Sequence, residues 1–288
     1  MTEQRWVSPA KLNLCLHING RYDNGYHALQ SVFVPITPCD TIDIRPRDDQ
    51  RIERLGGLPG LPAEDDLALK AARSLSHHMG GHPFGVDLRV DKVIPAGAGL
   101  GGGSSNAATV LVALNALWEA GCDRPTLMQL ATSLGADVPF FLDASPAWVE
   151  GIGEQMTPVT VDDAVFLVVV PAVHISTATV FTHPKLTRNQ PLTKMSALSR
   201  SGRVSEIVEN GVNNCEPVVR ELAPDVVQVF EWLEEFGTPR MSGTGSAVFV
   251  VLDDVAAAGA ALDRLPARWR GWVSQIWSGS RCMAADSG

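Results

Sequence analysis

A run of glycines lies where an alternating segment of the sequence gives way to a helical one. Residues 95–105 read PAGAGLGGGSS, and five of the seven residues from Gly97 to Gly103 are glycine. Glycine has no Cβ, so it can adopt positive φ and let the main chain approach a ligand closely. A helix that follows such a loop directs its unpaired N–H groups toward the loop, which is an arrangement that binds anions. The segment therefore predicts a phosphate-binding loop.

A flexible linker is the alternative interpretation, because linkers are also rich in glycine. The residues that follow favour a binding loop. Val110, Leu111 and Leu114 recur at helical spacing, and Ser104–Asn106 are of the residue types that cap helix N-termini. We therefore interpret the glycines as part of a binding site.

Other known phosphate loops differ from this one. Gly97, Gly99 and Gly102 fit the G-x-G-x-x-G pattern of dinucleotide-binding folds. That pattern expects an acidic residue about twenty positions further on, where Asp123 stands. The strand expected before the loop, at 84–90, alternates between apolar and polar residues, whereas a central parallel strand is apolar throughout. The Lys-Ser/Thr pair of a P-loop and the motifs of protein kinases are lacking too. The dinucleotide match is accidental.

The charge and the apolar pattern exclude several classes of partner. A formal charge of −9 argues against nucleic acid or an anionic membrane surface, because either would need a basic excess. The longest apolar run, 164–173, contains Pro171 and is far shorter than the roughly 20 residues that span a bilayer. The N-terminus shows no signal-peptide pattern. The five cysteines, at 15, 39, 122, 215 and 282, are dispersed and typical of reduced thiols. We expect a cytoplasmic protein.

Alternating and helical segments follow one another in an order typical of an α+β protein. The composition shifts near 151–158, so we predict two domains, 1–153 and 154–288. The second half resembles a split βαβ sandwich, with a sheet on one side and helices on the other. Strands are expected at 11–18, 28–36, 41–44, 84–90, 140–142, 165–170, 247–252 and 272–277, and helices at 64–77, from the loop to residue 121, and at 125–134, 205–219, 224–236 and 256–265.

Three blocks of sequence resemble one superfamily of small-molecule kinases. They read SPAKLN at 8–13, PAGAGLGGGSSNA at 95–107 and MSGTGSA at 241–247. Their order and spacing match the superfamily of galactose, homoserine, mevalonate and phosphomevalonate kinases (GHMP kinases) over nearly the whole chain. The resemblance implies a two-domain fold with the glycine-rich loop in an N-terminal α/β domain and a ferredoxin-like split βαβ domain at the C-terminus. It also implies ATP and Mg²⁺ as cofactors.

Further motifs are similar to one branch of the superfamily, whose acceptor is an alcohol linked to cytidine diphosphate. They are Gly25-Tyr26-His27, GADVP at 135–139 and SGTGSAVF at 242–249. This resemblance implies transfer of the ATP γ-phosphoryl group to the 2-hydroxyl of a cytidine-diphosphate-linked methylerythritol, a step of non-mevalonate isoprenoid synthesis. Two alternatives stay open. One is a kinase for another small alcohol, such as homoserine or mevalonate, and the other is a non-catalytic nucleotide-binding module.

The resemblance assigns a catalytic pair and an ATP loop. Asp137 matches the catalytic carboxylate and Lys11 its lysine partner. From the pattern alone, Asp137 could be an ordinary loop residue after a helix, and Lys11 could be solvated on the strand face opposite Leu12, Leu14 and Leu16. The Mg²⁺ ligands are unknown, with Ser104 and Ser105 as candidates. The residues expected to hold the ATP triphosphate are Pro95, Ala96, Gly97, Ala98, Gly99, Leu100, Gly101, Gly102, Gly103, Ser104 and Ser105.

The resemblance also implies where the substrate binds. Tyr26 and His27 match a cytosine-binding pair, since a base can stack on aromatic rings. Phe181 is the expected second stacking face, although a phenylalanine beside an apolar segment usually packs in a core. Asn13 matches a residue near the substrate diphosphate. Asp66 stands where the family commonly has Asn, and a carboxylate cannot donate a hydrogen bond, so its contact with ATP stays open. We expect a monomer or a weak homodimer.

Overall fold

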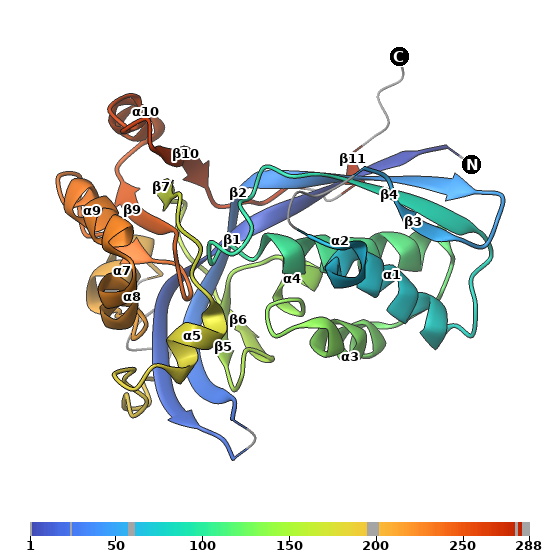
Figure 1. Ribbon diagram of the computed structural model, residues 1–288, viewed down its shortest axis with the longest axis horizontal. Helices are drawn as coiled ribbons and strands as arrows, with labels where there is room; N and C mark the ends of the chain where they lie inside the picture. Colours follow the sequence, from blue (N-terminus) through green and yellow to red (C-terminus); the bar gives the residue numbers. More distant parts are fainter. Residues whose placement is uncertain (1, 24, 57–60, 195–201, 280–281, 284–288) are drawn as a thin grey trace.

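Two β-sheets with helices packed against them make up the computed structural model (Figure 1). It describes residues 2–23, 25–56, 61–194, 202–279 and 282–283. Within these residues, the first sheet has seven strands and the second has four. Helices α1 to α4 lie along one face of the first sheet, and α7 to α10 gather around the second (Figure 1). The α+β architecture predicted from the sequence is confirmed.

The first sheet is built on a long antiparallel hairpin. β1 and β2 form this hairpin, β4 continues the sheet antiparallel to β2, and β3 pairs parallel to β4. β5 pairs with β2 and β6, and β11 pairs with β1. The strands are β1 (Gln4–Arg21), β2 (His27–Arg47), β3 (Ile52–Arg54), β4 (Gly85–Asp91), β5 (Ala147–Glu150), β6 (Gln155–Pro158) and β11 (Cys282–Met283).

Helices cover the first sheet and enclose one of the apolar cores. Asp66 and Asp123 cap two of them, each accepting a hydrogen bond from an amide in the first turn. The acidic residue that completed the dinucleotide pattern is therefore a helix cap. The elements are the 3₁₀ turn η1 (Ala63–Asp65) and helices α1 (Leu67–His78), α2 (Gly102–Leu117), α3 (Arg124–Leu134) and α4 (Phe140–Asp143).

The second sheet has the order β10-β7-β9-β8 and is antiparallel throughout. Alternate residues of β7 point to opposite sides. Phe166 and Val168 pack toward the first sheet, whereas Leu167 and Val169 pack against α8 and α9. The elements are β7 (Val165–Pro171), α5 (Thr177–Thr182), α7 (Val204–Asn210), α8 (Glu216–Leu222), α9 (Pro224–Leu233), β8 (Arg240–Met241), β9 (Val248–Leu252), α10 (Val255–Asp263) and β10 (Trp269–Gln275).

Several predicted elements were wrong in detail, among them the strands 28–36 and 41–44, which are one continuous strand, β2. The segment 140–142 is the short helix α4 instead of a strand, because three consecutive apolar side chains do not distinguish a buried helix from a buried strand. α2 begins at Gly102, two residues before the expected caps, with Gly101 as its N-cap residue. The predicted helix 205–219 is divided into α7, which ends at Asn210, and α8, which begins at Glu216; between them, Asn213 Oδ1 accepts from the amide of Cys215, the N-cap residue of α8.

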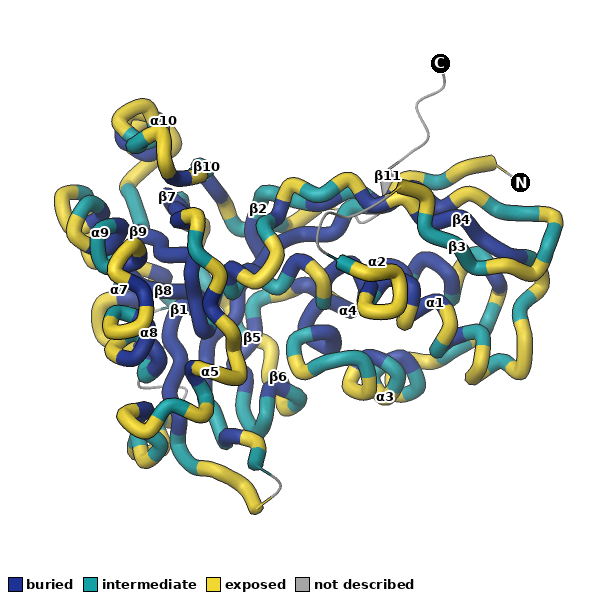
Figure 2. Tube along the Cα trace, viewed as in Figure 1, coloured by how far each residue is buried: buried dark blue, intermediate teal, exposed yellow. Residues whose placement is uncertain are grey.

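The hairpin strand β1 is buried on both faces, whereas the sequence predicted a single buried face. Leu12 and Leu14 pack between the two sheets. Leu16 lies in a different core, with α8 and α9, because a register shift between Asn13 and Cys15 rotates the strand. The opposite face is closed as well, since Asn13 is only 2% exposed. Figure 2 shows this part of β1 dark along its length.

The predicted domain boundary at 153/154 falls between β5 and β6, which pair as an antiparallel hairpin; the boundary stays a prediction. Within the described ranges, no helix is long and apolar enough to cross a bilayer.

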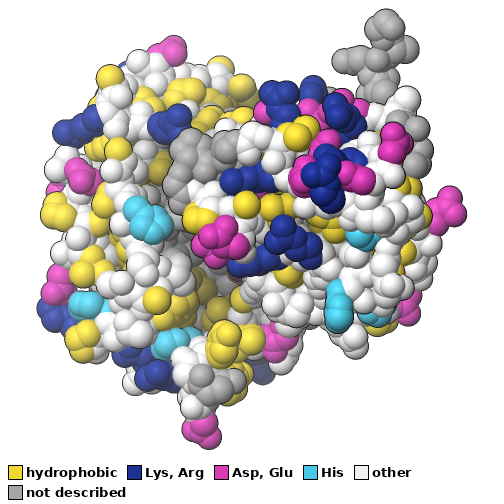
Figure 3. Space-filling model, turned by 45° about the vertical axis from the view of Figure 1, so that its right-hand side comes forward, with side chains coloured by type: hydrophobic (Ala, Val, Ile, Leu, Met, Phe, Trp, Pro, Cys, Tyr) yellow, Lys and Arg dark blue, Asp and Glu magenta, His cyan; other side chains and the backbone are white. Residues whose placement is uncertain are grey.

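Lys and Arg side chains on the face drawn in Figure 3 are intermixed with Asp and Glu. This mixture matches the ion pairs along β2, β3 and β4, such as Arg47 with Asp87 and Glu53.

Candidate active site

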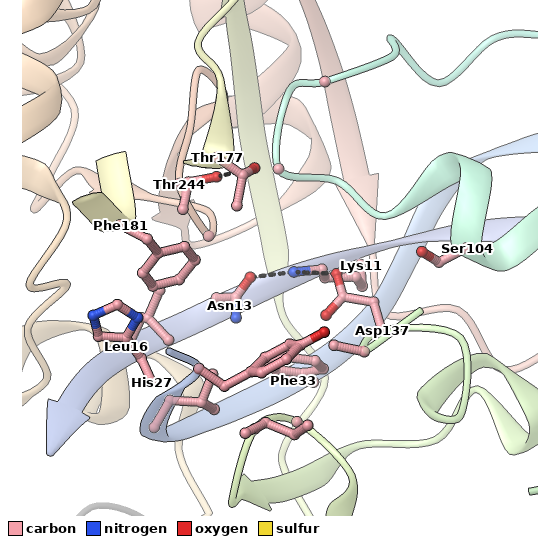
Figure 4. A pocket seen from close by; sticks show the side chains of 18 of the residues that line it. Lys11, Asn13, Leu16, His27, Phe33, Ser104, Asp137, Thr177, Phe181 and Thr244 are labelled. Carbon is pink, nitrogen blue, oxygen red and sulfur yellow. Dashed lines mark hydrogen bonds and ion pairs between the residues drawn. The ribbon is translucent and has the colours of Figure 1, made fainter. Parts of the chain in front are cut away.

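A cavity of about 630 Å³ lies where the β1–β2 hairpin, the glycine-rich loop and α5 meet (Figure 4). Residues that are far apart in the sequence line it together. The turn at 25–27 and α5 form one end, and the loop forms the other. Nine of the predicted site residues line this cavity: Lys11, Asn13, Tyr26, His27, Gly97, Gly99, Ser104, Asp137 and Phe181.

Lys11 and Asp137 form an ion pair in the middle of the cavity wall. Lys11 Nζ is 3.4 Å from Asp137 Oδ2. Asp137 lies in the turn between α3 and α4, and its side chain is 35% exposed, whereas that of Lys11 is 3% exposed. The carboxylate is thus open to a ligand, while the ammonium beside it is almost completely buried (Figure 4).

The environment of Lys11 corrects the interpretation of this residue as solvated. Its ammonium donates to Asn13 Oδ1 and lies 4.6 Å from the centre of the Phe33 ring, a cation–π distance. Asn13 Nδ2 donates to Ser31 Oγ at 3.1 Å, which holds the amide group in place. A buried lysine needs such partners because an unpaired charge is costly away from water.

The carbonyl groups of the glycine-rich loop are turned toward the protein. Each of three successive carbonyls accepts a hydrogen bond from a different part of the chain, so the loop is fixed to β1 and to the second sheet. The carbonyl of Ala98 accepts from Ala247 N at 3.0 Å, that of Gly99 from Ser242 Oγ at 2.9 Å, and that of Leu100 from Lys11 N at 3.0 Å.

The amide groups at the start of α2 are left for a ligand. Gly101 has φ of +72°, which turns the chain into the helix, and its carbonyl accepts from Ser105 N at 2.8 Å. Among the described residues, no protein acceptor is assigned to the amides of Gly102, Gly103 and Ser104. Free amides and the positive end of the helix dipole together favour an anion at this place.

The block 242–246 holds the loop from the other side. Ser242 Oγ donates to the carbonyl of Gly99, and Gly243 and Thr244 line the cavity. Buried Asn213 donates to the carbonyls of Met241 and Gly243, both at 2.8 Å. The sequence motif at 241–247 was recognised, but its residues were not included among the predicted site residues.

Other predicted loop residues lie away from the cavity. Pro95, Ala96 and Ala98 line a separate, smaller hollow of about 410 Å³. Ser105 is completely buried, and its hydroxyl accepts from Ser8 Oγ at 2.8 Å. Ser104, in contrast, lines the main cavity.

Asp40 supports the segment that enters the loop and was missed by the sequence analysis. It is completely buried and accepts from the amides of Val93 and Ile94, both at 2.8 Å. Lys92 Nζ lies 2.5 Å from its other oxygen. One carboxylate on β2 therefore fixes the residues just before Pro95. In the sequence Asp40 falls between the predicted strands 28–36 and 41–44, where an acidic residue gives no signal of this role.

Three aromatic side chains form the far end of the cavity. The ring of His27 stacks on Phe181, with centroids 5.0 Å apart and planes at 21° (Figure 4). Phe181 also packs against the core beneath α8 and α9, so it has both a packing face and a cavity face. Tyr26 is 57% exposed at the cavity mouth. Flat rings of this kind can hold a planar base by stacking.

Residues 66–144 match the GHMP kinases N terminal domain, and residues 195–271 match the GHMP kinases C terminal domain. 4-Diphosphocytidyl-2-C-methyl-D-erythritol kinase of Halorhodospira halophila is 50% identical over 94% of this chain and 92% of its own. The enzyme of the same name from Nitrosococcus oceani is 46% identical over 94% and 93%. The chain belongs to the 4-diphosphocytidyl-2-C-methyl-D-erythritol kinase family.

Superposition on solved structures supports the same family assignment. The crystal structure of a 4-(cytidine 5′-diphospho)-2C-methyl-D-erythritol kinase superposes with a TM-score of 0.81 and 32% identity, covering 96% of this chain and 100% of that one. Homoserine kinase from Cytophaga hutchinsonii gives a TM-score of 0.73 at 17% identity, covering 96% and 95%. The second similarity shows a shared fold alone. The family and the two-domain GHMP kinase fold expected from the motifs are confirmed.

Asp66, the departure from the family pattern, has both carboxylate oxygens engaged. One accepts from the amide of Ala68 at 2.9 Å, and the other pairs with Arg54 Nη1 at 3.0 Å. The side chain is 6% exposed. In this kinase Asp66 therefore caps α1 and forms an ion pair with Arg54. An asparagine at this position could cap the helix but could not form the ion pair.

The cavity also offers oxygens to a metal ion. Magnesium is usually held by one or two protein oxygens together with substrate phosphates. Asp137 and Ser104 both line the cavity of this kinase. In the part of the chain that the structure describes, no group of three or more His, Cys, Asp or Glu is arranged to hold a metal. This sparse donor set fits a magnesium ion that is bound mainly through ATP, and it favours Ser104 over the buried Ser105.

Proposed function

We propose that this kinase transfers the γ-phosphoryl group of ATP to the 2-hydroxyl of 4-diphosphocytidyl-2-C-methyl-D-erythritol, releasing ADP, in the non-mevalonate isoprenoid pathway. The single observation that carries the proposal is the position of the Lys11–Asp137 pair. It lies on one cavity wall between a loop with free amides and an aromatic end suited to a base. Phosphoryl transfer depends mainly on such positioning and on stabilisation of charge.

Each part of the cavity has a distinct task in this mechanism. Asp137 accepts the proton of the attacking hydroxyl, a contribution of about 10²–10⁴-fold in rate. Lys11 offsets the negative charge that develops beside it, and Asn13 fixes the direction of the ammonium group. The amides of Gly102–Ser104 hold phosphate oxygens. Magnesium, when bound, would neutralise charge on the transferred group.

The alternative acceptors are less well suited to this cavity. Homoserine and mevalonate have no planar base, so the aromatic end formed by Tyr26, His27 and Phe181 would have no ligand to stack on. A non-catalytic nucleotide-binding module would not need the ion pair of Lys11 with Asp137. The cytidylyl acceptor uses both ends of the cavity.

A coupled assay of ADP release tests the proposal. The purified protein is given ATP and Mg²⁺ with the cytidylyl substrate, homoserine or mevalonate in turn. We expect turnover with the cytidylyl substrate alone. Turnover with homoserine or mevalonate, and none with the cytidylyl substrate, would overturn the proposal.

Tyr26→Ala is expected to raise KM for the cytidylyl substrate by about 5- to 160-fold, because stacking contributes about 1–3 kcal/mol for each base. KM for ATP should change by less than about twofold, since the loop lies at the other end of the cavity. Tyr22→Ala is the matched control, because Tyr22 lies in the same turn and does not line the cavity. Equal increases of both KM values in Tyr26→Ala would contradict a base-stacking role.

The other expectations are proposals of the same kind. We propose Mg²⁺ as the metal, a cytoplasmic location and a monomeric or weakly dimeric state. Dialysis against EDTA followed by separate addition of Mg²⁺ and Ca²⁺ tests which metal ion the reaction requires. Full activity of the metal-free protein would exclude a requirement for Mg²⁺.

A further inference from the structure

Arg188 lies directly beside the aromatic end of the cavity, in the segment that follows α5. It is half-buried, and no carboxylate of the described residues lies within ion-pair distance of it. Its guanidinium instead donates four hydrogen bonds within this end of the molecule. Nε donates to His27 Nε2 at 3.1 Å, Nη1 to the carbonyl of Leu186 at 3.1 Å, and Nη2 to the carbonyls of Phe181 at 2.9 Å and His183 at 2.8 Å.

The bond to His27 determines which ring nitrogen carries the proton. An arginine side chain donates hydrogen bonds and cannot accept them. His27 Nε2 must therefore present its lone pair to Arg188. A neutral imidazole has one N–H, so the proton of His27 is on Nδ1.

The charges around His27 keep its ring neutral. Burial lowers the pKa of His27 first, and the positive charges of Arg188 and Arg21 lower it further. These two arginines are the charged groups that act on the ring, which stacks on Phe181. At neutral pH the ring is thus an uncharged donor at Nδ1.

The guanidinium also fixes the second aromatic ring. Its bonds to the carbonyls of Phe181 and His183 hold the end of α5, from which the Phe181 side chain extends. One side chain therefore connects both members of the stacked pair. The rest of the segment is attached independently, because Gln190 N donates to the carbonyl of Ile18 at 3.0 Å and Thr193 N to Gln30 Oε1 at 2.8 Å.

We propose that Arg188 is a positioning residue for the cytosine, which holds His27 in its Nδ1–H tautomer and keeps Phe181 stacked against it. The inference rests on the proposed function, since it concerns how the base of that substrate is bound. Cytosine has an acceptor at N3 where uracil has an N–H group. A donor at Nδ1 of His27 therefore favours cytosine over uracil.

Arg188→Gln tests this inference, because glutamine retains a donor and removes the charge and the forked geometry. We expect KM for the cytidylyl substrate to rise about tenfold, which corresponds to the loss of a hydrogen bond, with KM for ATP unchanged. The preference for cytidine over uridine diphosphate, measured as a ratio of dissociation constants, should fall. Arg188→Lys, which retains the charge, is the second variant.

Lys185→Gln is the matched control. Lys185 lies in the same segment, and its side chain pairs with the exposed Glu221, so its loss should change each KM by less than about twofold. A thermal melt of each variant reports whether it folds.

Nitrogen NMR of the ligand-free protein gives a readout that a merely structural role would not alter. The wild type should carry the His27 proton on Nδ1. Since removal of a nearby positive charge favours protonation, the His27 ring in Arg188→Gln should titrate at higher pH than in the wild type.

A proton on Nε2 of His27 in the wild type, or equal affinity of wild type and Arg188→Gln for cytidine diphosphate, would overturn the inference. Failure of the wild type to use the cytidylyl substrate would instead refute the proposed function, and the NMR and cytidine diphosphate measurements would still decide the role of Arg188.

Discussion

Asp137→Asn is expected to lower kcat by at least about 100-fold, because the variant loses the carboxylate that accepts the proton of the attacking hydroxyl. Asparagine has nearly the same shape, and Asp137 is partly exposed, so the fold should be retained. The affinity for ATP, measured by calorimetry, should change little, since the loop amides and α2 lie on other elements. Initial rates at saturating ATP and cytidylyl substrate give kcat.

Asp143→Asn provides the control for this substitution. Asp143 ends α4, only six positions further on, and its exposed carboxylate pairs with Arg124. Its replacement removes the same charge from the same region, yet kcat should stay within about twofold, because exposed ion pairs contribute little. If kcat of Asp137→Asn were equal to that of the wild type, Asp137 would have no part in the chemistry.

Gly99→Ala is expected to impair both folding and ATP binding. Gly99 has φ of +79°, and a Cβ there would lie 2.2 Å from the carbonyl oxygen of Ser242. The backbone strain and the collision together should lower the free energy of unfolding by about 2–5 kcal/mol. Because the loop must shift, KM for ATP should rise at least about tenfold. Urea denaturation and initial rates measure the two effects.

Gly80→Ala separates backbone strain from collision. Gly80 has φ of +71°, but a Cβ there would meet nothing within 4 Å. It should lower the free energy of unfolding by about 1–2 kcal/mol and leave KM for ATP unchanged. If both variants behaved alike, the contact between the loop and Ser242 would not matter for ATP binding.

Local patterns predicted most of the elements and the nature of the loop. The spacing of apolar residues placed β1, β4, α3 and β7, and the glycines on their own indicated an anion-binding loop. The same patterns could not determine how the layers are stacked. Lys11 looked solvated, because nothing in a single strand shows that a second layer closes its other face.

Residues that act through long-range contacts were the ones missed. Asp40 reaches Val93 across the sheet, and Arg188 reaches His27 across 161 positions of sequence. Neither stands in a motif, and an arginine between Thr187 and Asn189 in a polar segment gives no signal of its own. Such contacts depend on tertiary folding, so local periodicity carries no information about them.

The β1–β2 hairpin also sets the distance between the two ends of the cavity. His27 and Phe33 stand six positions apart on β2, which is about 20 Å along a strand, and they mark the base end and the lysine end of the same cavity. Because both residues lie on one strand that is paired with β1, the extended backbone and its hydrogen bonds hold this distance. The hairpin thus sets the distance between the base and the reacting hydroxyl of an acceptor that can be phosphorylated. Once its base is bound, only an alcohol whose linker spans this length can bring a hydroxyl to Asp137.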